Sequence, residues 1–225
     1  DYRLITLAPS SVQEMADFVG LGFELAFKYS NPAIILADGV IGQMMEKVVL
    51  PEQRTRLTDE EVIARCPWAT TGRTHHRTPN IITSLELDPA EMEKRNIHLQ
   101  KKYAEIEENE VRFEELHCED AEYLIVAFGS CARIAQKAME MAREEGIKVG
   151  LLRPITLWPF PSKAIAARAA QVKGILTVEL NAGQMVEDVR LAVECKVPVE
   201  HFGRLGGIVP DPDEVITALK EKLIK

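Results

Sequence analysis

The sequence contains no apolar run close to the ~18–20 residues that a membrane-spanning helix requires. Cysteine is scarce, and its four copies form no C-x-x-C pair: Cys66, Cys118, Cys131 and Cys195. Zinc ribbons and iron–sulfur clusters take closely spaced cysteine ligands, so we expect neither to be held by this chain alone and assign no metal ligands. Disulfides are not expected in a reducing compartment.

A basic surface is also missing, because the net charge of the 225 residues is −8. This balance argues against binding to nucleic acid and suits solubility or a basic partner surface. The N-terminus, Asp1-Tyr2-Arg3, has neither an initiator Met nor the pattern of a signal peptide. We therefore expect a cytoplasmic protein, and a chain that is a fragment or has a processed or engineered terminus.

The stretch from Ala121 to Pro161 has the clearest secondary-structure pattern in the sequence, and the fold prediction starts from it. Tyr123–Phe128 is a short apolar run rich in strand formers, Gly129-Ser130 interrupts it, and residues 131–144 repeat apolar side chains at helical spacing. A second apolar strand follows at Val149–Leu152. This pattern predicts a βαβ unit, in which the two strands are parallel and the crossover is right-handed.

Two residues at the start of that helix are candidates for chemistry. Ser130 is placed to act as the N-cap, and the free N–H groups around it are suited to an anion; a cap without a ligand is the alternative. Cys131 lies in the first turn, where the helix dipole lowers the pKa of a thiol. The alternative for Cys131, which we favour, is a small buried packing residue.

Residues 1–50 resemble the end of an α/β domain. Ser10 or Ser11 caps a predicted helix that ends at residues 29–32, and residues 33–37 form an apolar strand expected to be buried on both sides. Asp38-Gly39 follows this strand. The carboxyl ends of strands are where open α/β sheets bind ligands, so Asp38 is a candidate binding residue; ordinary turn chemistry is the alternative.

Proline and glycine interrupt any helical or strand spacing of apolar residues in residues 51–90, which predicts an extended connection. Cys66, His75 and His76 make a poor metal set, because adjacent histidines in an extended segment point in opposite directions. We favour an interface or substrate-channel role for the loop at residues 70–77. Residues 89–116 are highly charged with apolar residues at loose helical spacing, which predicts one or two amphipathic surface helices.

From residue 118 onward, helices and strands alternate as in a doubly wound, mostly parallel sheet. Three strand ends then meet at one edge, and they carry Ser130, Arg153 and Asn181. Together with Asp38, these are our candidate cofactor-binding residues, while the catalytic residues stay unknown. The glycine-rich residues 202–207 lack G-x-G-x-x-G, so a dinucleotide site has weak support.

Several motifs together resemble the α subunit of the 2-oxoacid:ferredoxin oxidoreductases. Residues 84–115 incline the resemblance toward the branched-chain type, which acts on 3-methyl-2-oxobutanoate. The matching stretches cover nearly the whole chain and are specific only as a set: PSSVQEM at 9–15, LADGVIGQM at 36–44, GS at 129–130, LLRPITLWPFP at 151–161, ELNAGQM at 179–185 and GRLGG at 203–207.

The resemblance implies oxidative decarboxylation of a 2-oxoacid to its acyl-CoA, with electrons passed through iron–sulfur clusters to ferredoxin. It implies thiamine diphosphate, Mg²⁺ and iron–sulfur clusters as cofactors of the holoenzyme, and other subunits (the thiamine diphosphate-binding β, the γ and the ferredoxin-like δ), ferredoxin and CoA as partners. Residues 1–50 would be the C-terminal remnant of a pyrimidine-binding thiamine domain, residues 51–117 a linker with a charged helix, and residues 118–225 a transketolase C-terminal-like domain.

The chain also departs from the family in one respect. The resemblance places the carboxylate that activates the cofactor upstream of Asp1 and the magnesium–diphosphate site in another subunit. We therefore expect this polypeptide to be a subunit fragment that is inactive alone and binds no cofactor by itself. Two alternatives stay open: an assembly or CoA- and anion-binding module using Ser130, Arg153 and Asn181, and a fragment of a transketolase-like thiamine enzyme.

Overall fold

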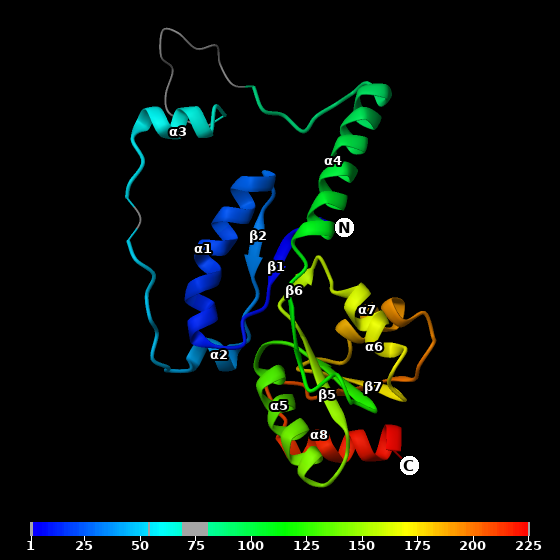
Figure 1. The fold of residues 1–225 in the computed structure, drawn as a ribbon. Helices are drawn as coiled ribbons and strands as arrows, with labels where there is room; N and C mark the ends of the chain where they lie inside the picture. Colours follow the sequence, from blue (N-terminus) through cyan, green and yellow to red (C-terminus); the bar gives the residue numbers. More distant parts are fainter. Residues whose placement is uncertain (1, 54, 69–80, 225) are drawn as a thin grey trace. The chain divides into compact units, whose positions relative to one another are not determined.

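The structure is a computed structural model that describes residues 2–53, 55–68 and 81–224 (Figure 1). It divides into two compact units, one made of Asp1–Val49 with Lys102–Lys225 and the other of Leu50–Lys101. Within the described residues, no helix is both long and apolar enough to cross a membrane. The predicted loop at residues 70–77, with His75 and His76, falls outside the described residues.

A five-stranded sheet forms the centre of the first unit, in the order β3-β5-β4-β7-β8. β4, β5, β7 and β8 are parallel, and β3 is antiparallel to β5 at one edge. The doubly wound, mostly parallel sheet predicted from the sequence is confirmed. The strands are β3 (Phe113–Leu116), β4 (Tyr123–Ala127), β5 (Val149–Pro154), β7 (Gly174–Glu179) and β8 (Val199–Gly203).

Helices cover both faces of this sheet because successive side chains in each strand point to opposite sides. Ile125 and Leu176 pack in one core with α5 and α8, while Leu124 and Ile175 pack in a second core with α6 and α7. Figure 1 shows the two helix pairs on opposite sides of the strands. The helices are α5 (Gly129–Glu144), α6 (Ser162–Ala169), α7 (Met185–Val193) and α8 (Pro212–Leu219), followed by a π-helical turn at Lys220–Ile224.

A smaller sheet joins the beginning of the chain to its later part. β1 (Ile5–Leu7) pairs in parallel with β2 (Ala33–Ile35) and antiparallel with β6 (Thr156–Trp158). β2 is therefore an edge strand, and Ile34 is 40% exposed. The expectation that residues 33–37 are buried on both sides was wrong, because an apolar run does not distinguish a central strand from an edge strand.

Helix α1 (Val12–Tyr29) connects β1 to β2 and has the limits that its sequence predicts. The Ser11 hydroxyl accepts the Glu14 N–H at 3.1 Å, and Ser30 ends the helix in the left-handed conformation at φ 46°. A serine in the N-cap position satisfies one of the orphan N–H groups of the first turn. The next turn, at Asp38, starts the short helix α2 (Gly39–Gln43).

Two elements between residues 50 and 117 differ from the sequence prediction. α3 (Asp59–Arg65) interrupts the expected extended connection and is specified locally by a capping box between Thr58 and Glu61. α4 (Pro89–Asn109) is the predicted charged helix, but it ends before residue 116. Residues 113–116 form β3 instead, because Phe113–Leu116 finds the open edge of β5.

Glu110 ties the end of α4 to α1. Its side chain is 4% exposed and accepts from Lys28 at 2.7 Å, from Tyr29 at 2.6 Å and from Arg112 at 2.9 Å. Burial by itself raises the pKa of Glu110, but these hydrogen bonds outweigh it and lower the pKa to about 2. A carboxylate with a depressed pKa stabilises the folded state wherever it is ionised.

We expect Glu110→Gln to lower the free energy of unfolding at pH 7 by about 2 kcal/mol, because the ionised partner of Lys28 and Arg112 is removed. The contribution of Glu110 is complete above pH 4.5 and is lost as the pH falls toward 2. Urea denaturation across this range should show the difference between the proteins shrinking below pH 4.5. Glu108→Gln, at an exposed position of the same helix, should leave the curve unchanged.

Candidate functional site

The carboxyl ends of β4, β5 and β7 meet at one edge of the large sheet, as the sequence predicts. Ser130 follows β4, Arg153 is the penultimate residue of β5, and Asn181 follows β7. Asp38 reaches the same edge from the turn after β2, because its carboxylate contacts Ser130. The structure therefore brings Asp38 and Ser130 together, and the contacts of each candidate decide what it can do.

Asp38 holds the beginnings of two helices. Its Oδ1 accepts the N–H groups of Val40 and Ile41, each at 3.0 Å, and its Oδ2 accepts the Ser130 N–H at 2.8 Å. Burial by itself raises the pKa of Asp38, but the hydrogen bonds from the N–H groups of Ile41, Ser130 and Val40 outweigh burial. The net effect is a lowered pKa, so the group stays ionised. The carboxylate is stabilised at the N-termini of α2 and α5 because helix dipoles and free N–H groups favour an anion there.

Ser130 does not cap α5 as predicted. The helix begins one residue earlier, at Gly129, its N-cap is Phe128 and no side chain caps it. Ser130 is 3% exposed, and its hydroxyl makes no hydrogen bond of normal geometry within the described residues. The Ser130 N–H at this helix end is bound by the carboxylate of Asp38, a group of the chain itself.

Gly129 makes this contact possible. Its φ is +61°, and a Cβ built on it would lie 2.8 Å from Asp38 Oδ2. Only glycine combines that left-handed conformation with so close an approach. The Gly129-Ser130 pair is therefore a requirement of the Asp38 contact.

Cys131 is the buried packing residue favoured by the sequence. It is 3% exposed within the core between α5 and the sheet. Burial, with the charges of Asp38 and Glu179, raises the pKa of its thiol to about 12. A reactive thiolate needs the opposite shift, so the helix dipole does not activate Cys131.

Arg153 is buried in a salt-bridge network that joins β5 to α1. It donates to Glu14 Oε2 at 2.9 Å and to Glu14 Oε1 at 2.7 Å, and also to the Ser10 hydroxyl. Its Nε lies 3.1 Å from a carboxylate oxygen of Glu114. The pKa of Glu14 is lowered, because the hydrogen bonds from Arg153 and Ser10 outweigh the raising effect of burial. Arg153 is thus paired with carboxylates of the chain itself, and its contact with an external anion stays a prediction.

Asn181 and Glu179 serve the start of α7. Asn181 Oδ1 accepts the Gly183 N–H at 2.7 Å, which closes a turn, and its predicted contact with a ligand stays a prediction. Glu179 is fully buried and accepts the N–H groups of Gln184, Met185 and Val186 at 2.8–3.1 Å. Its Oε1 lies 3.4 Å from His201 Nδ1.

Sequence reasoning missed the roles of Glu14 and Glu179. A carboxylate at the end of the otherwise apolar run GILTVEL was the available signal for Glu179, because a buried carboxylate needs donors close by. Glu14 carries only the ordinary signal of an acid in the first turn of a helix. Together these contacts make the sheet edge a rigid junction, and no group of three or more His, Cys, Asp or Glu side chains suited to a metal ion occurs in the described parts of the chain.

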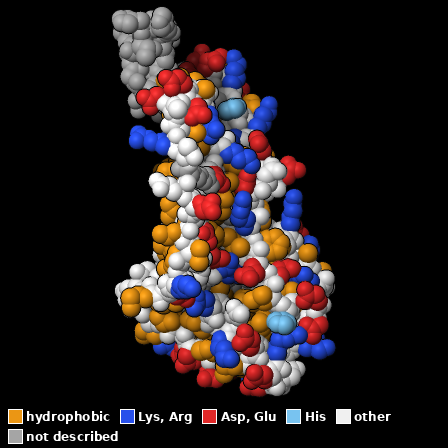
Figure 2. Space-filling view, turned by 60° about the vertical axis from the view of Figure 1, so that its left-hand side comes forward, with side chains coloured by type: hydrophobic (Ala, Val, Ile, Leu, Met, Phe, Trp, Pro, Cys, Tyr) orange, Lys and Arg blue, Asp and Glu red, His pale blue; other side chains and the backbone are white. Residues whose placement is uncertain are grey.

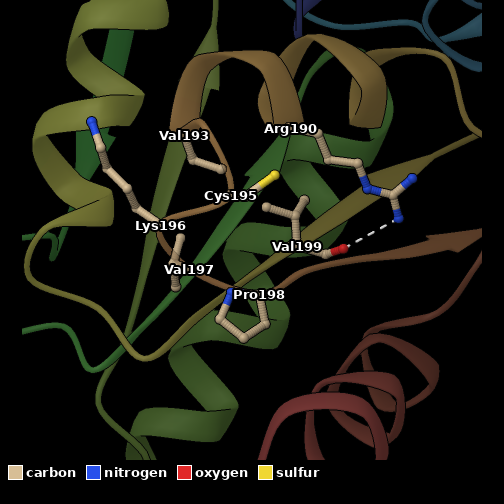
Figure 3. Close-up of a pocket in the computed structure, with 7 residues that line it drawn as sticks. All are labelled: Arg190, Val193, Cys195, Lys196, Val197, Pro198 and Val199. Carbon is tan, nitrogen blue, oxygen red and sulfur yellow. Dashed lines mark hydrogen bonds between the residues drawn. The ribbon is translucent and has the colours of Figure 1, made fainter.

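A separate pocket of about 400 Å³ lies at the opposite, amino end of β8, at its connection from α7 (Figure 3). Val193, Val197 and Pro198 give it apolar walls, and Arg190 donates to the Val199 carbonyl oxygen at 3.2 Å. Lys196 pairs with Glu194 at 2.8 Å. Cations at this position complement the C-terminal end of α7. The pocket is not part of the candidate site, because it lies at the opposite end of the sheet's parallel strands.

Comparison with known proteins assigns the family. A family model described as pyruvate flavodoxin/ferredoxin oxidoreductase, thiamine diphosphate-binding, matches residues 1–117. The chain belongs to the pyruvate flavodoxin/ferredoxin oxidoreductase family. A second model, for core domain II of pyruvate:ferredoxin oxidoreductase, matches residues 121–215 of this family member.

Two curated relatives and one solved structure show how far the similarity extends. The chain is 46% identical over 221 residues to ketoisovalerate oxidoreductase subunit VorB of Methanothermobacter marburgensis, covering 98% of this chain and 61% of the relative. It is 32% identical to 2-oxoglutarate synthase subunit KorA of Archaeoglobus fulgidus, covering 94% of this chain and 59% of the relative. The chain thus spans about three fifths of the length of these relatives.

The solved 2-oxoglutarate:ferredoxin oxidoreductase from Magnetococcus marinus shares the fold, with a TM-score of 0.75 and 24% identity. The match covers 96% of this chain and 42% of that one. That structure contains 2-oxoglutarate, coenzyme A and succinyl-CoA. At this level of identity the comparison supports the α/β architecture of our chain and nothing finer.

The family description names thiamine diphosphate, so the question is whether residues of this chain could hold that cofactor. A diphosphate is held through a divalent cation, which needs carboxylate or carbonyl oxygens that are free to coordinate it. Asp38, the acidic candidate in the matched region, already accepts three N–H groups. It does not fit the role of a cation ligand, so we derive no catalytic step through the cofactor from these residues.

We expect Gly129→Ala to lower the free energy of unfolding by at least about 2 kcal/mol, since the new Cβ meets the Asp38 carboxylate in a left-handed backbone conformation. Urea denaturation of the two proteins measures the change. Gly20→Ala is the matched control, because nothing lies within 4 Å of the new Cβ in the middle of α1. It should stabilise the protein by up to about 1 kcal/mol, and a similar gain in Gly129→Ala would contradict the role given to Gly129.

Proposed function

We propose that this chain is part of the α subunit of a thiamine diphosphate-dependent 2-oxoacid:ferredoxin oxidoreductase. The enzyme oxidatively decarboxylates a 2-oxoacid in the presence of CoA, giving acyl-CoA, CO₂ and reduced ferredoxin. The observation that carries the proposal is the 46% identity to VorB over 98% of the chain. The match of both family models along the same chain supports it.

The substrate in this proposal is a branched-chain 2-oxoacid, 3-methyl-2-oxobutanoate. Identity to the ketoisovalerate oxidoreductase subunit exceeds identity to the 2-oxoglutarate synthase subunits, 46% against 32% and 30%. All three comparisons cover more than nine tenths of the chain, so the difference is not a matter of alignment length. The acyl pocket itself lies mainly in other parts of the assembly.

Within the enzyme, the role of this chain is to hold the subunit together, and it is inactive alone. The charged side chains at its sheet edge support this role, because Asp38 and Glu179 already accept backbone N–H groups of the chain and Arg153 is paired with Glu14. Thiamine diphosphate with Mg²⁺ and the iron–sulfur clusters are then held by other segments or subunits. The partners are the β, γ and ferredoxin-like δ subunits, ferredoxin and CoA.

Residues 1–50 belong, in this proposal, to a larger pyrimidine-binding domain. The groove between α1 and β2, with a volume of about 180 Å³, is lined by apolar side chains that include Val19, Phe23 and Ile35. Figure 2 brings the α1 side of the view forward and shows hydrophobic side chains gathered on that face. An open edge strand beside an apolar groove is suited to a further strand and helix, and the relatives are longer than this chain.

Hydrogen exchange tests the open edge at β2. The Leu36 N–H donates to Leu7 in β1, so the alternation of a strand turns the Ile35 N–H toward the outer edge. In the longer subunit we expect the Ile35 amide to be protected at least tenfold more than in this chain. The Leu36 amide is the internal control and should be protected in both. Equal exchange of Ile35 in the two proteins would contradict a sheet that continues at β2.

Activity of the assembled enzyme tests the reaction. We expect CoA-dependent reduction of ferredoxin with 3-methyl-2-oxobutanoate, with kcat/KM at least tenfold above the values for 2-oxoglutarate and pyruvate. This chain alone, supplied with thiamine diphosphate, Mg²⁺ and CoA, should give no acyl-CoA. A preference for 2-oxoglutarate would overturn the branched-chain assignment, and turnover by the chain alone would overturn its supporting role.

A further inference from the structure

The six residues that follow α2, Met44–Val49, lie outside the helices and strands of the first unit. None of their side chains is buried, and Met45 is 99% exposed. Among the described residues, only the Met44 N–H of this segment bonds to another backbone group, the Ile41 carbonyl oxygen at 3.2 Å. Neither a buried side chain nor a strand partner holds the segment, which we call the strap.

The strap is fastened to the beginning of α1 at two points. Gln13 Oε1 accepts the Val49 N–H at 2.8 Å, and Gln13 Nε2 donates to the Val49 carbonyl oxygen at 3.0 Å. Glu46 accepts the Val12 N–H at 2.9 Å. Val12 is the first residue of α1, where the N–H has no partner within the helix, so the strap supplies one.

A third contact joins the strap to α5. Glu46 pairs with Arg133 at 2.9 Å, and Arg133 also donates to the Ser10 carbonyl oxygen at 3.3 Å. The side chains of Glu46 and Arg133 are 27% and 44% exposed, and the two hydrogen bonds of Gln13 with Val49 are exposed as well. Exposed ion pairs contribute little to stability and are screened by salt. The strap is therefore held by weak, partly salt-dependent contacts.

We propose that the strap is a latch, which opens and recloses as one unit while the rest of the first unit stays folded. Segments with few buried apolar contacts and exposed hydrogen bonds open locally, at a free energy below that of global unfolding. Opening exchanges the partners of the Val12 and Val49 N–H groups for water, and the net contribution of such hydrogen bonds is small. The buried cores of the first unit are untouched, because no strap residue belongs to them.

The latch sets the length of free chain between α2 and α3. With the strap fastened, residues 50–57 separate it from Thr58, the N-cap of α3. With the strap open, the free chain is residues 44–57 and is longer by the whole strap. Six extended residues span up to about 20 Å. Opening therefore lengthens the reach of the connection to α3 by up to about that distance, and salt favours the longer form.

Native-state hydrogen exchange of single amides, followed by NMR, tests the latch. We expect the Val12 and Val49 amides to be protected, and to exchange by local opening at rates that low concentrations of urea do not change. High salt should speed the exchange of both amides. The internal control is the amide of Leu25, a buried residue of α1, which should exchange far more slowly and respond to urea.

Two variants show whether the strap opens as one unit. Gln13→Ala removes both bonds to Val49, and a single latch predicts faster exchange of the Val12 amide too, although its partner is Glu46. Arg133→Gln should speed the exchange of both amides about two- to fivefold at low salt, as expected for the loss of one exposed ion pair. Lys137→Gln is the matched control on α5, because Lys137 pairs with Glu140 of the same helix.

Four outcomes would overturn the latch. Val12 and Val49 amides that exchange with the rate and urea dependence of Leu25 would mean that the strap opens only on global unfolding. An unprotected Val49 amide would mean that the strap is not fastened. Faster exchange of Val49 alone in Gln13→Ala would mean that the two points open separately. Equal exchange in Arg133→Gln and Lys137→Gln would remove the salt-dependent contact.

Discussion

The first unit depends on a carboxylate placed where two helices begin. Asp38 accepts N–H groups from the first turns of both α2 and α5, although Ser130 lies 92 residues away in the sequence. Even a partly buried carboxylate is costly to desolvate, and here the free N–H groups of two helix ends offset that cost. The contact fixes the turn after β2 against the strand ends of the large sheet.

A second contact, centred on the cation Arg153, also joins the beginning of the chain to the large sheet. Arg153 lies near the end of β5 and donates to both carboxylate oxygens of Glu14, in the first turn of α1. Buried ion pairs gain most when the geometry is bidentate. Here the Ser10 hydroxyl accepts a further hydrogen bond from Arg153, and a carboxylate oxygen of Glu114 lies 3.1 Å from its Nε. Asp38 and Arg153 therefore join the same two parts of the chain at one sheet edge, which is where α/β proteins usually receive ligands.

The parts of the fold that could be predicted from the sequence are those with a local signal. The alternating strands and helices after residue 118 follow their apolar periodicity, and α1 begins at its serine cap and ends at Ser30. β1 and β6 have three residues each, too few for a pattern, and they exist because they pair with each other. Local sequence contains no information about such a partner.

The candidate site shows the same limit. Sequence placed Asp38, Ser130, Arg153 and Asn181 at strand ends correctly, but it could not show which groups would face them. Whether a strand-end carboxylate or guanidinium is open to a ligand depends on long-range contacts such as Glu14 with Arg153.

The pairing of Thr6 in β1 with Trp158 in β6 has a consequence for folding during synthesis. About 150 residues separate the two, so β1 and β6 can pair only after the ribosome has added about 150 residues beyond β1. Until then β1 of the nascent chain stays unpaired on that side.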